Sequence, residues 1–437
     1  MEKNNKEYIV LVVLAIIMIA VLFIKMPKDN AEGSIPKIDI NSLSDNGNYE
    51  DIIELWRQDI SYLAKNLKSR HKNLYHTISK NELGKETNLL LEKIPDLNNI
   101  GRVIGIKRLV AKIGDGHTTV IENMNVRYFP LKFMIFEDGI VVTNTTQEYK
   151  EILGTKLIQI GNEPVENIID KMGDMISRDN DVQLLKGTLN YLINADFLYE
   201  YGYIKDIKES KYVFQNSEGE KITLDLKSLS TQSNNKWVSI VSKYPKIADM
   251  IYIKNTNNPY WYEYLSEEKL IYFQYNVCMN NKEKPINEFI DELSAFIEDK
   301  EVEKFVFDMR FNGGGDSRII EPLIDKLAKN KAINTKDNLY VVIGSDTFSS
   351  AILNTLSMKK ETNATLIGSP TGGKPNHYGE IKTFKLPNTG ITIQYSTKYF
   401  KHSNNDEDSI YPDINIKYYL DDFINGVDPV MNKIMKK

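Results

Sequence analysis

The first clear hydrophobic pattern of the chain is an uninterrupted apolar run at residues 8–24, which follows a short polar head and is closed by Lys25. A helix needs roughly 17–25 apolar residues to cross a bilayer, so this run is just long enough. It has no polar face, and it does not end in the small-residue cleavage site typical of a signal peptide. We therefore expect residues 1–26 to form a single-pass transmembrane signal anchor in the cell membrane, with the rest of the chain outside the cytoplasm. A cleaved signal peptide is the alternative.

Beyond a polar segment at 27–47, which has the composition of a linker, the spacing of apolar positions becomes helical. Ile52, Ile60 and Leu67 belong to one stripe with three- and four-residue spacing, the pattern of an amphipathic helix. Two further helices are predicted near 82–91 and 100–113. The pattern thus predicts a helical subdomain at 48–125.

The spacing then changes to the alternation expected of strands, at residues 126–180. This region contains a predicted hairpin with Gly161 and Asn162 at its turn, followed by a helix. Residues 181–265 combine a predicted helix near 184–201 with charged hairpin patterns, and they read as a connecting region of mixed α/β structure.

Strands and helices alternate from residue 266 to the C-terminus. The pattern predicts strands at 270–273, 305–307, 339–343 and 364–367, and helices at 286–297, 319–327 and 351–358. Two antiparallel strands are predicted at 381–386 and 391–396. A β-α alternation of this kind predicts a mostly parallel sheet that is covered on both faces.

Composition narrows the possible functions. Hydrophobic residues make up 41% of the 437 positions and charged residues 26%, the proportions of a globular protein with two to four domains. The net charge of −5 gives no electrostatic reason to expect a nucleic-acid partner. A single cysteine, Cys278, excludes an intrachain disulfide and a cysteine zinc cluster, and no two of the five histidines have HExxH spacing. We therefore expect neither a metal nor an organic cofactor.

A glycine-rich segment carries the first chemical signal. Residues 308–317 read DMRFNGGGDS, and they lead from a predicted buried strand into a helix. Consecutive glycines let another group approach the backbone closely, and N–H groups at a helix start can hold an anion or an oxyanion. A plain turn would need one glycine, and a phosphate loop would need a lysine that is absent here. Gly313 and Gly314 are therefore predicted to hold an anion or oxyanion.

A serine-rich turn follows the next buried strand, where residues 344–351 read GSDTFSSA. A serine between a strand and the first turn of a helix presents its hydroxyl at the carboxyl end of the strand. The helix dipole favours negative charge there. Ser349 is thus a candidate nucleophile. Capping of the helix N-terminus is the more common role of such serines and is the alternative.

A serine nucleophile needs a base, and two segments supply candidates. Lys374, in GSPTGGKPNHY, would qualify only if burial lowered its pKa, whereas most lysines are solvated. His117, in KIGDGHTT, is a possible general base, although such a histidine more often bonds to the backbone. Asp406 and Glu407 could orient the base as a third triad member, or could simply lie in a charged surface loop.

Together these segments resemble, in order and spacing, the motifs of the tail-specific, or C-terminal processing, serine protease family. DMRFNGGG is similar to that family's D-L-R-x-N-x-G-G, DTFSSA to its T-A-S-A/S block, and GSPTGGK to its G-x-x-T-x-G-K block. YPDI is similar to its closing P-D-I, and DGHTT to its D-x-H-T element. The resemblance, from about residue 50 to the C-terminus, implies an α/β fold with a crotonase-like (ClpP/crotonase) spiral core. It also implies a Ser349 nucleophile and an oxyanion hole formed by Gly314 or Gly313 with Ser350.

The resemblance leaves two arrangements of the base open. The bacterial processing branch uses a Ser/Lys dyad, here Lys374, with a glutamine four residues later, where this chain has Tyr378. The tricorn-like branch uses a histidine from the helical part, here His117, and an acid near the P-D-I block, here Asp406 or Glu407. The wording GGKPNHYGE also resembles the branch related to retinoid-binding-protein repeats, some members of which are not proteases.

The family's PDZ domain has a partial counterpart. LGTKLIQIGNEPV is similar to the late hairpin of a PDZ domain, whereas the early carboxylate-binding loop is not evident. We therefore expect a degenerate PDZ-like region at 126–180, followed by the connecting region at 181–265 and a catalytic core at 266–437.

The leading hypothesis is a serine-type peptidase that hydrolyses extracytoplasmic polypeptides. A non-catalytic module that binds peptide or another ligand in the same cleft is one alternative, and an esterase is another. The sequence makes no prediction of the oligomeric state.

Overall fold

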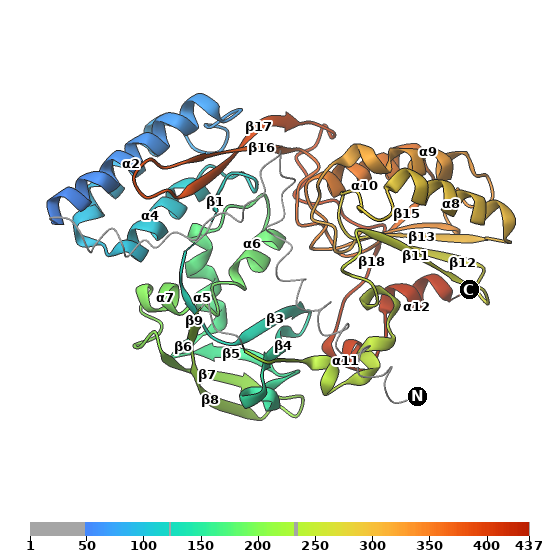
Figure 1. Ribbon diagram of the computed structural model, residues 1–437, viewed down its shortest axis with the longest axis horizontal. Coiled ribbons are helices and arrows are strands. Elements are labelled where there is room, and N and C mark those ends of the chain that lie inside the picture. The colour runs from blue at the N-terminus through green and yellow to red at the C-terminus, as the bar shows by residue number, and fades with distance from the viewer. Residues whose placement is uncertain (1–48, 122–123, 231–234, 437) are drawn as a thin grey trace.

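Residues 49–121, 124–230 and 235–436 are described by the computed structural model of the chain. They form three parts: a helical layer with a long hairpin, a mainly antiparallel sheet, and a sheet covered by helices (Figure 1). The apolar run at 8–24 and the predicted linker lie outside these residues. Among the residues described, no helix has both the length and the apolar character needed to cross a membrane.

The first part is helical, as its apolar spacing predicted. It contains α2 (Tyr49–Arg70), α3 (Lys80–Lys93) and α4 (Asn99–Ala111). The buried side chains Ile52, Ile60 and Leu63 lie on one face of α2. Helix α3 begins at a capping box, in which Ser79 accepts from the Glu82 N–H and the Glu82 side chain accepts from the Ser79 N–H. These reciprocal bonds satisfy two amides that a helix start would otherwise leave without partners.

A hairpin from the C-terminal third of the chain completes the first part. Strands β16 (His377–Lys385) and β17 (Thr392–Phe400) pair antiparallel, and β1 (Thr119–Ile121) pairs with β17. Phe384 and Ile393 of the hairpin share one apolar core with Trp56 of α2. The hairpin lies inside the predicted core at 266–437, yet it packs on the predicted subdomain at 48–125. The three parts of the structure therefore do not coincide with the segments predicted along the sequence.

The second part is built on an antiparallel sheet of seven strands. Its strands are β3 (Leu131–Phe136), β4 (Gly139–Thr146), β5 (Lys156–Ile160), β6 (Glu163–Pro164), β7 (Glu209–Gln215), β8 (Lys221–Lys227) and β10 (Trp237–Ser239). A two-stranded ribbon of β2 (Arg127–Tyr128) and β9 (Leu229–Ser230) lies beside it, with helices α5 (Val165–Met172), α6 (Asp181–Thr188) and α7 (Ala195–Glu200).

Several predictions for this second part are confirmed and one is not. The β5–β6 hairpin turns at Gly161, which has a φ of 59°, and α5 follows it. The single helix predicted near 184–201 is instead two, α6 and α7, because the chain turns and Asn194 caps a new helix. Strands β7 and β8 come from the predicted connecting region but extend the sheet of the predicted PDZ-like region, since β5 pairs with β7.

The third part is the predicted covered sheet, with strand order β11-β12-β13-β14-β15-β18. The strands are β11 (Tyr260–Leu265), β12 (Leu270–Tyr275), β13 (Lys304–Asp308), β14 (Leu339–Ile343), β15 (Thr365–Gly368) and β18 (Ile414–Asn415). All neighbours from β12 to β18 are parallel, and β11 alone pairs antiparallel. The prediction of a mostly parallel sheet is confirmed.

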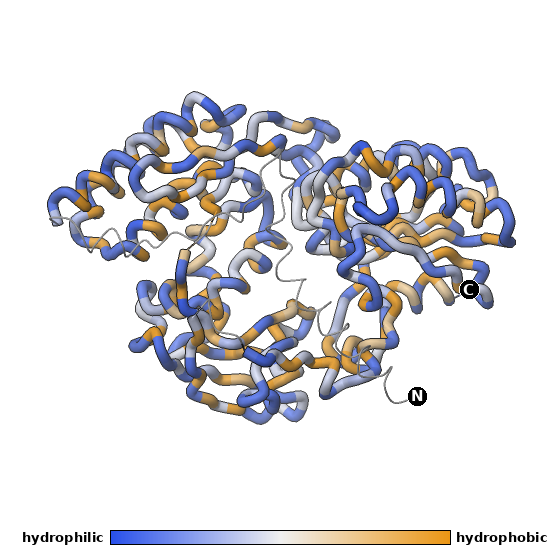
Figure 2. The backbone as a smooth tube through the Cα atoms, in the orientation of Figure 1, coloured by the Kyte–Doolittle hydropathy of each residue, from blue (hydrophilic) through white to orange (hydrophobic). Residues whose placement is uncertain are grey.

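Alternate residues of this sheet belong to two different cores. Phe305 and Phe307 of β13 pack with helices α8 (Ile286–Asp299), α9 (Glu321–Lys329) and α10 (Ser350–Glu361) on one face. Val306, between them, packs on the other face with α11 (Leu420–Ile424) and α12 (Pro429–Met435). This two-residue alternation follows from the pleat of a strand. Both faces are therefore apolar, and Figure 2 shows the apolar positions gathered along these strands.

Short 3-10 turns occur at Ile94–Asp96, Gln147–Ile152, Gly173–Met175, Ile240–Ser242, Pro245–Asp249, Ile251–Ile253 and Ser317–Ile320.

Candidate active site

Ser349 occupies the turn between β14 and the first residue of α10. Its backbone has φ 53° and ψ −123°, a region that residues other than glycine rarely adopt. Such a conformation costs about 1–3 kcal/mol and is most often retained at functional sites. The Ser349 side chain does not cap α10, so the N-cap alternative does not account for it. The strained turn holds its hydroxyl at the carboxyl end of a buried strand, where a nucleophile would be placed.

The glycine-rich loop lies directly against Ser349. Gly314 has a φ of 107°, and a Cβ atom built on it would lie 2.7 Å from Cβ of Ser349 and 2.9 Å from N of Ser350. The buried Asn312 fastens the two loops together, because its backbone carbonyl accepts from the Phe348 N–H at 3.0 Å. Glycine is thus required at 314 both by its backbone angle and by this close approach.

Two of the three predicted oxyanion donors are available. The N–H of Gly314 already donates to Oδ1 of Asn312 at 2.9 Å. The N–H groups of Gly313 and Ser350 make no hydrogen bond within the described part of the chain. The Ser350 hydroxyl donates to the Gly315 carbonyl at 2.6 Å, which holds the start of α10 on the glycine loop. An oxyanion formed at Ser349 would therefore meet the amides of Gly313 and Ser350 first.

His117 comes from the helical part and reaches the residue next to Ser349. Its ring stacks on the ring of Phe348, with centroids 4.4 Å apart, and on that of His377 at 5.7 Å. The residue is 5% exposed, and neither ring nitrogen makes a hydrogen bond of good geometry to a described residue. Burial lowers the pKa of His117, and the charge of Asp115 partly opposes this. The ring is therefore neutral near pH 7 and able to accept a proton.

Lys374 is held in a different environment. Its Nζ lies 3.0 Å from Asp408 and 4.0 Å from Asp406. Burial alone would lower the pKa of Lys374, but the hydrogen bond to Asp408 and the two carboxylate charges outweigh it and raise the pKa. A lysine whose pKa is raised is a poor base. Asp406 therefore contacts Lys374 rather than His117, and the exposed Glu407 has no ion-pair partner among the described residues.

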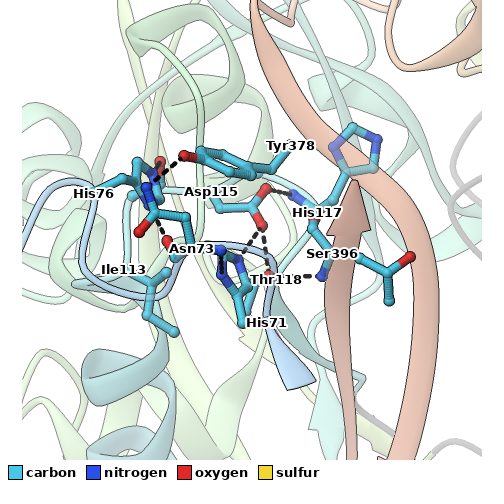
Figure 3. Close-up of polar contacts among 12 residues, drawn as sticks. His71, Asn73, His76, Ile113, Asp115, His117, Thr118, Tyr378 and Ser396 are labelled. Atoms are coloured by element: carbon cyan, nitrogen blue, oxygen red, sulfur yellow. Dashed lines mark hydrogen bonds and ion pairs between the residues drawn. The ribbon is translucent and has the colours of Figure 1, made fainter. Parts of the chain in front are cut away.

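The acid closest to His117 is Asp115, which the sequence did not single out. Figure 3 shows Asp115 at the centre of a group of polar contacts. Its Oδ1 accepts from the His117 N–H at 2.8 Å, and its Oδ2 accepts from the Thr118 hydroxyl at 2.5 Å and lies 3.0 Å from Nε2 of His71. Burial by itself would raise the pKa of Asp115, but the hydrogen bond from His71 and the neighbouring groups hold it well below its usual range. The D-x-H spacing was the one available signal.

Asp179 and Asn180 tie the loop of His117 to the loop of Lys374. Oδ1 of Asp179 accepts from the Gly116 N–H at 2.7 Å, while its Oδ2 has no hydrogen-bond partner in the described residues. Burial and the charge of Asp115 raise the pKa of Asp179 to about 7. Asn180 donates to the carbonyls of Thr371 at 3.1 Å and Asp408 at 2.7 Å. The sequence analysis singled out neither residue.

A cavity of about 720 Å³ lies between the second and third parts. Strand β3 and helix α6 line one side, and the loops that precede Ser349 and Lys374 line the other, through Ser345 and Pro370 among others. Most of its surface is apolar. An ion pair between Lys186 of α6 and Asp346 joins its two sides. Within the described residues, no group of three or more His, Cys, Asp or Glu side chains is arranged to hold a metal ion.

The sequence between residues 269 and 416 matches a known family, described as Peptidase family S41. The chain carries an S41 peptidase domain. This domain includes the glycine loop, Ser349 and Lys374, whereas His117 lies outside the matched residues. A search of curated proteins found no match.

Two solved structures share the fold over most of this chain. The structure of mature CPAF complexed with lactacystin has a TM-score of 0.63 and 13% sequence identity, and the match covers 88% of this chain and 98% of that one. A second structure of mature CPAF has a TM-score of 0.61 and 13% identity, covering 88% and 96%. At this identity the likeness establishes the fold, a mixed α/β architecture. The S41 match makes the chain a serine-type peptidase, a hydrolase.

Proposed function

We propose that this S41 chain hydrolyses extracytoplasmic polypeptides with Ser349 as its nucleophile and His117 as its general base. The observation that carries the proposal is the strained backbone of Ser349, which lies against a triple-glycine loop next to a buried histidine ring. We further propose that the third part is the crotonase-like (ClpP/crotonase) spiral core that the sequence motifs imply. Its parallel sheet and the position of Ser349 at a strand-to-helix turn support this.

The reaction would be acyl transfer to water. Oγ of Ser349 attacks the peptide carbonyl carbon while His117 takes the hydroxyl proton, and the oxyanion accepts hydrogen bonds from the Gly313 and Ser350 amides. His117 then gives its proton to the leaving amine, and water attacks the acyl-enzyme with His117 again as base. Because neither ring nitrogen of His117 makes a hydrogen bond of good geometry to a described residue, the proposed step requires the ring to turn toward Ser349 when substrate binds. Such tightening on substrate binding is common.

The cavity beside the serine suits a polypeptide. Strand β3 pairs with β4 along one edge, and residues along its whole length line the cavity. An extended peptide could add to the open edge of β3 and place apolar side chains in the cavity. The hairpin of β5 and β6 followed by α5 supports the interpretation of residues 126–180 as a degenerate PDZ-like region.

Labelling with a fluorophosphonate probe, followed by mapping of the modified residue, tests the proposal. We expect the label on Ser349, no labelling of Ser349→Ala, and loss of casein or reporter-peptide hydrolysis in that variant. Ser266→Ala is the control, because Ser266 is exposed between β11 and β12, does not line the cavity, and should keep both labelling and hydrolysis. Wild-type hydrolysis rates in Ser349→Ala would disprove the assignment.

The same experiment separates the alternatives. A non-catalytic binding module predicts no labelling and unchanged ligand binding in Ser349→Ala. An esterase predicts a labelled Ser349 with turnover of esters but not of peptides.

We also propose that the apolar run at 8–24 anchors the chain in the cell membrane, with the S41 domain outside the cytoplasm. Its support is the length and composition of the run. Full-length protein should pellet with membranes and be digested by protease added to intact cells. A soluble full-length chain protected inside cells would contradict this placement.

A further inference from the structure

Two histidines, His71 and His76, lie side by side against the loop that carries His117. The rings of His71 and His76 are parallel, with centroids 6.1 Å apart, and both pack against the ring of Tyr378 (Figure 3). Neither histidine belongs to the nucleophile, the base or the oxyanion donors described above. His71 has a fully buried side chain, whereas His76 is half-buried.

The hydrogen bonds of His71 determine which of its nitrogens carries the proton. Nδ1 of His71 accepts from the backbone N–H of Asn73 at 3.1 Å, so it has no proton. Nε2 must then be protonated, and it donates to Oδ2 of Asp115 at 3.0 Å. His71 is therefore a neutral donor with a fixed tautomer. An imidazolium at this position would lose the bond from Asn73.

The Asp115 carboxylate has its full set of hydrogen-bond donors only when His71 is present. One of its oxygens accepts from the His117 N–H, and the other accepts from Thr118 and His71. The Thr118 hydroxyl in turn accepts from the Ser396 N–H at 3.2 Å, which ties the group to β17. With the side chain of Asp115 fully buried, removal of one donor would leave part of a buried charge without compensation.

We propose that His71 is a positioning residue for His117, an inference that rests on the proposed function. It holds the Asp115 carboxylate in the orientation that fixes the His117 backbone and sets a negative charge beside the imidazole ring. When His117 takes the proton of Ser349, this fixed charge stabilises the imidazolium. His377 of β16 is a further titratable ring that faces His117, with ring centroids 5.7 Å apart.

NMR of the labelled imidazoles of Ser349→Ala protein tests this without relying on activity, since the chain has only five histidines. We expect His71 as the Nε2-protonated tautomer at pH 7. We expect His71→Phe to move the titration midpoint of His117 to lower pH, in the same direction as Asp115→Asn. His71→Gln, which keeps an N–H donor, should restore the midpoint.

Activity of the same variants with Ser349 intact supplies the second readout. His71→Phe should lower kcat by roughly 10- to 100-fold, part of what a general base contributes, with KM little changed. His76→Gln is the matched control, because His76 bonds to the Asn73 and Gly114 carbonyls and not to Asp115.

Three results would overturn the assignment: an Nδ1-protonated His71, an unchanged His117 midpoint in His71→Phe, or a His76→Gln effect as large as that of His71→Phe. If His71→Phe does not fold, the tautomer of His71 and the comparison of His71→Gln with wild type still test the assignment. Absence of serine labelling would refute the peptidase proposal but would leave the NMR result readable.

Discussion

At the scale of single residues, burial and local charge separate the chemically useful groups from those that only resemble them. His117 is buried, neutral and stacked beside the nucleophile turn. Lys374 is the second candidate base in the sequence, yet two carboxylates hold it as a cation. Burial likewise distinguishes the two acids. Asp115 is buried and accepts from the His117 N–H, whereas Asp406 is exposed.

Comparison of His117→Ala with Lys374→Ala identifies the base. We expect His117→Ala to lower kcat by about 10²–10⁴-fold, and Lys374→Ala to have a much smaller effect. Because burial lowers the pKa of His117, its neutral form persists below the ordinary histidine pKa. In wild type, kcat/KM should rise as pH increases through this lowered value and stay flat to about pH 8. A rise centred above pH 8, with activity lost in Lys374→Ala, would point to the lysine.

Asp179 should make stability depend on pH. Its pKa is raised from 3.8 to about 7 in the folded chain, so the unfolded chain loses this proton first as pH rises. The stability it contributes is therefore lost as pH rises from about 4 to 7. Asp179→Asn should match wild type near pH 4 and exceed it by roughly 1–3 kcal/mol at pH 8. Urea unfolding at both values measures this, with the exposed Asp181→Asn as control. Equal gains at both pH values would contradict the explanation.

At the scale of elements, the site is made by two loops that follow neighbouring parallel strands. Strands β13 and β14 end at the same edge of the sheet, so the glycine loop after one meets the serine turn after the other. The two loops approach so closely at Gly314 that a side chain there would meet Ser349 and the backbone of Ser350, which is why glycine is needed at this position. Neither loop could form the site alone.

Gly314→Ala should disrupt this contact, whereas Gly313→Ala should not. A Cβ at 314 meets Ser349 and Ser350 and requires a φ of 107°, but a Cβ at 313 meets nothing within 4 Å. We expect Gly314→Ala to lower the free energy of unfolding by at least about 1 kcal/mol and to slow fluorophosphonate labelling. Gly313→Ala should stay within about 0.5 kcal/mol of wild type. Equal stabilities of the two variants in urea unfolding would disprove the close approach.

At the scale of the whole molecule, distant parts of the chain share single cores. The β16–β17 hairpin leaves the S41 sheet and packs on helices from the N-terminal half, and β1, just after His117, pairs with its β17 strand. This arrangement brings the His117 ring to Phe348, the residue before Ser349. The proposed base is therefore positioned by pairing between segments that lie far apart in the sequence.

Asp59 of α2 should be a main fastening of this hairpin. Its buried carboxylate accepts from the Asn388 N–H at 3.0 Å and from the Thr389 N–H and hydroxyl at 2.8 and 2.6 Å. Asp59→Ala would leave these donors without an acceptor, so we expect a loss of about 2–4 kcal/mol in unfolding free energy. Ser61→Ala, at an exposed position of α2, should change it by less than about 0.5 kcal/mol. A stable Asp59→Ala protein would show that these hydrogen bonds are not needed to hold the hairpin.

The sequence by itself determined most elements and the nucleophile candidate. Apolar periodicity and turn residues act over a few positions, so the helices, the covered parallel sheet and the strand-to-helix turn at Ser349 could be predicted. The three consecutive glycines likewise predicted that another group approaches the backbone closely at this loop.

Only the tertiary structure decided what surrounds that turn. Whether Lys374 is neutral or charged depends on Asp408 and Asp406, and whether Asp115 is an anion depends on His71, at 3.0 Å in space but far away in the chain. Periodicity carries no information on such contacts. Burial and long-range pairing set the charges of these groups. Those charges determine whether a side chain can accept a proton or is already a cation.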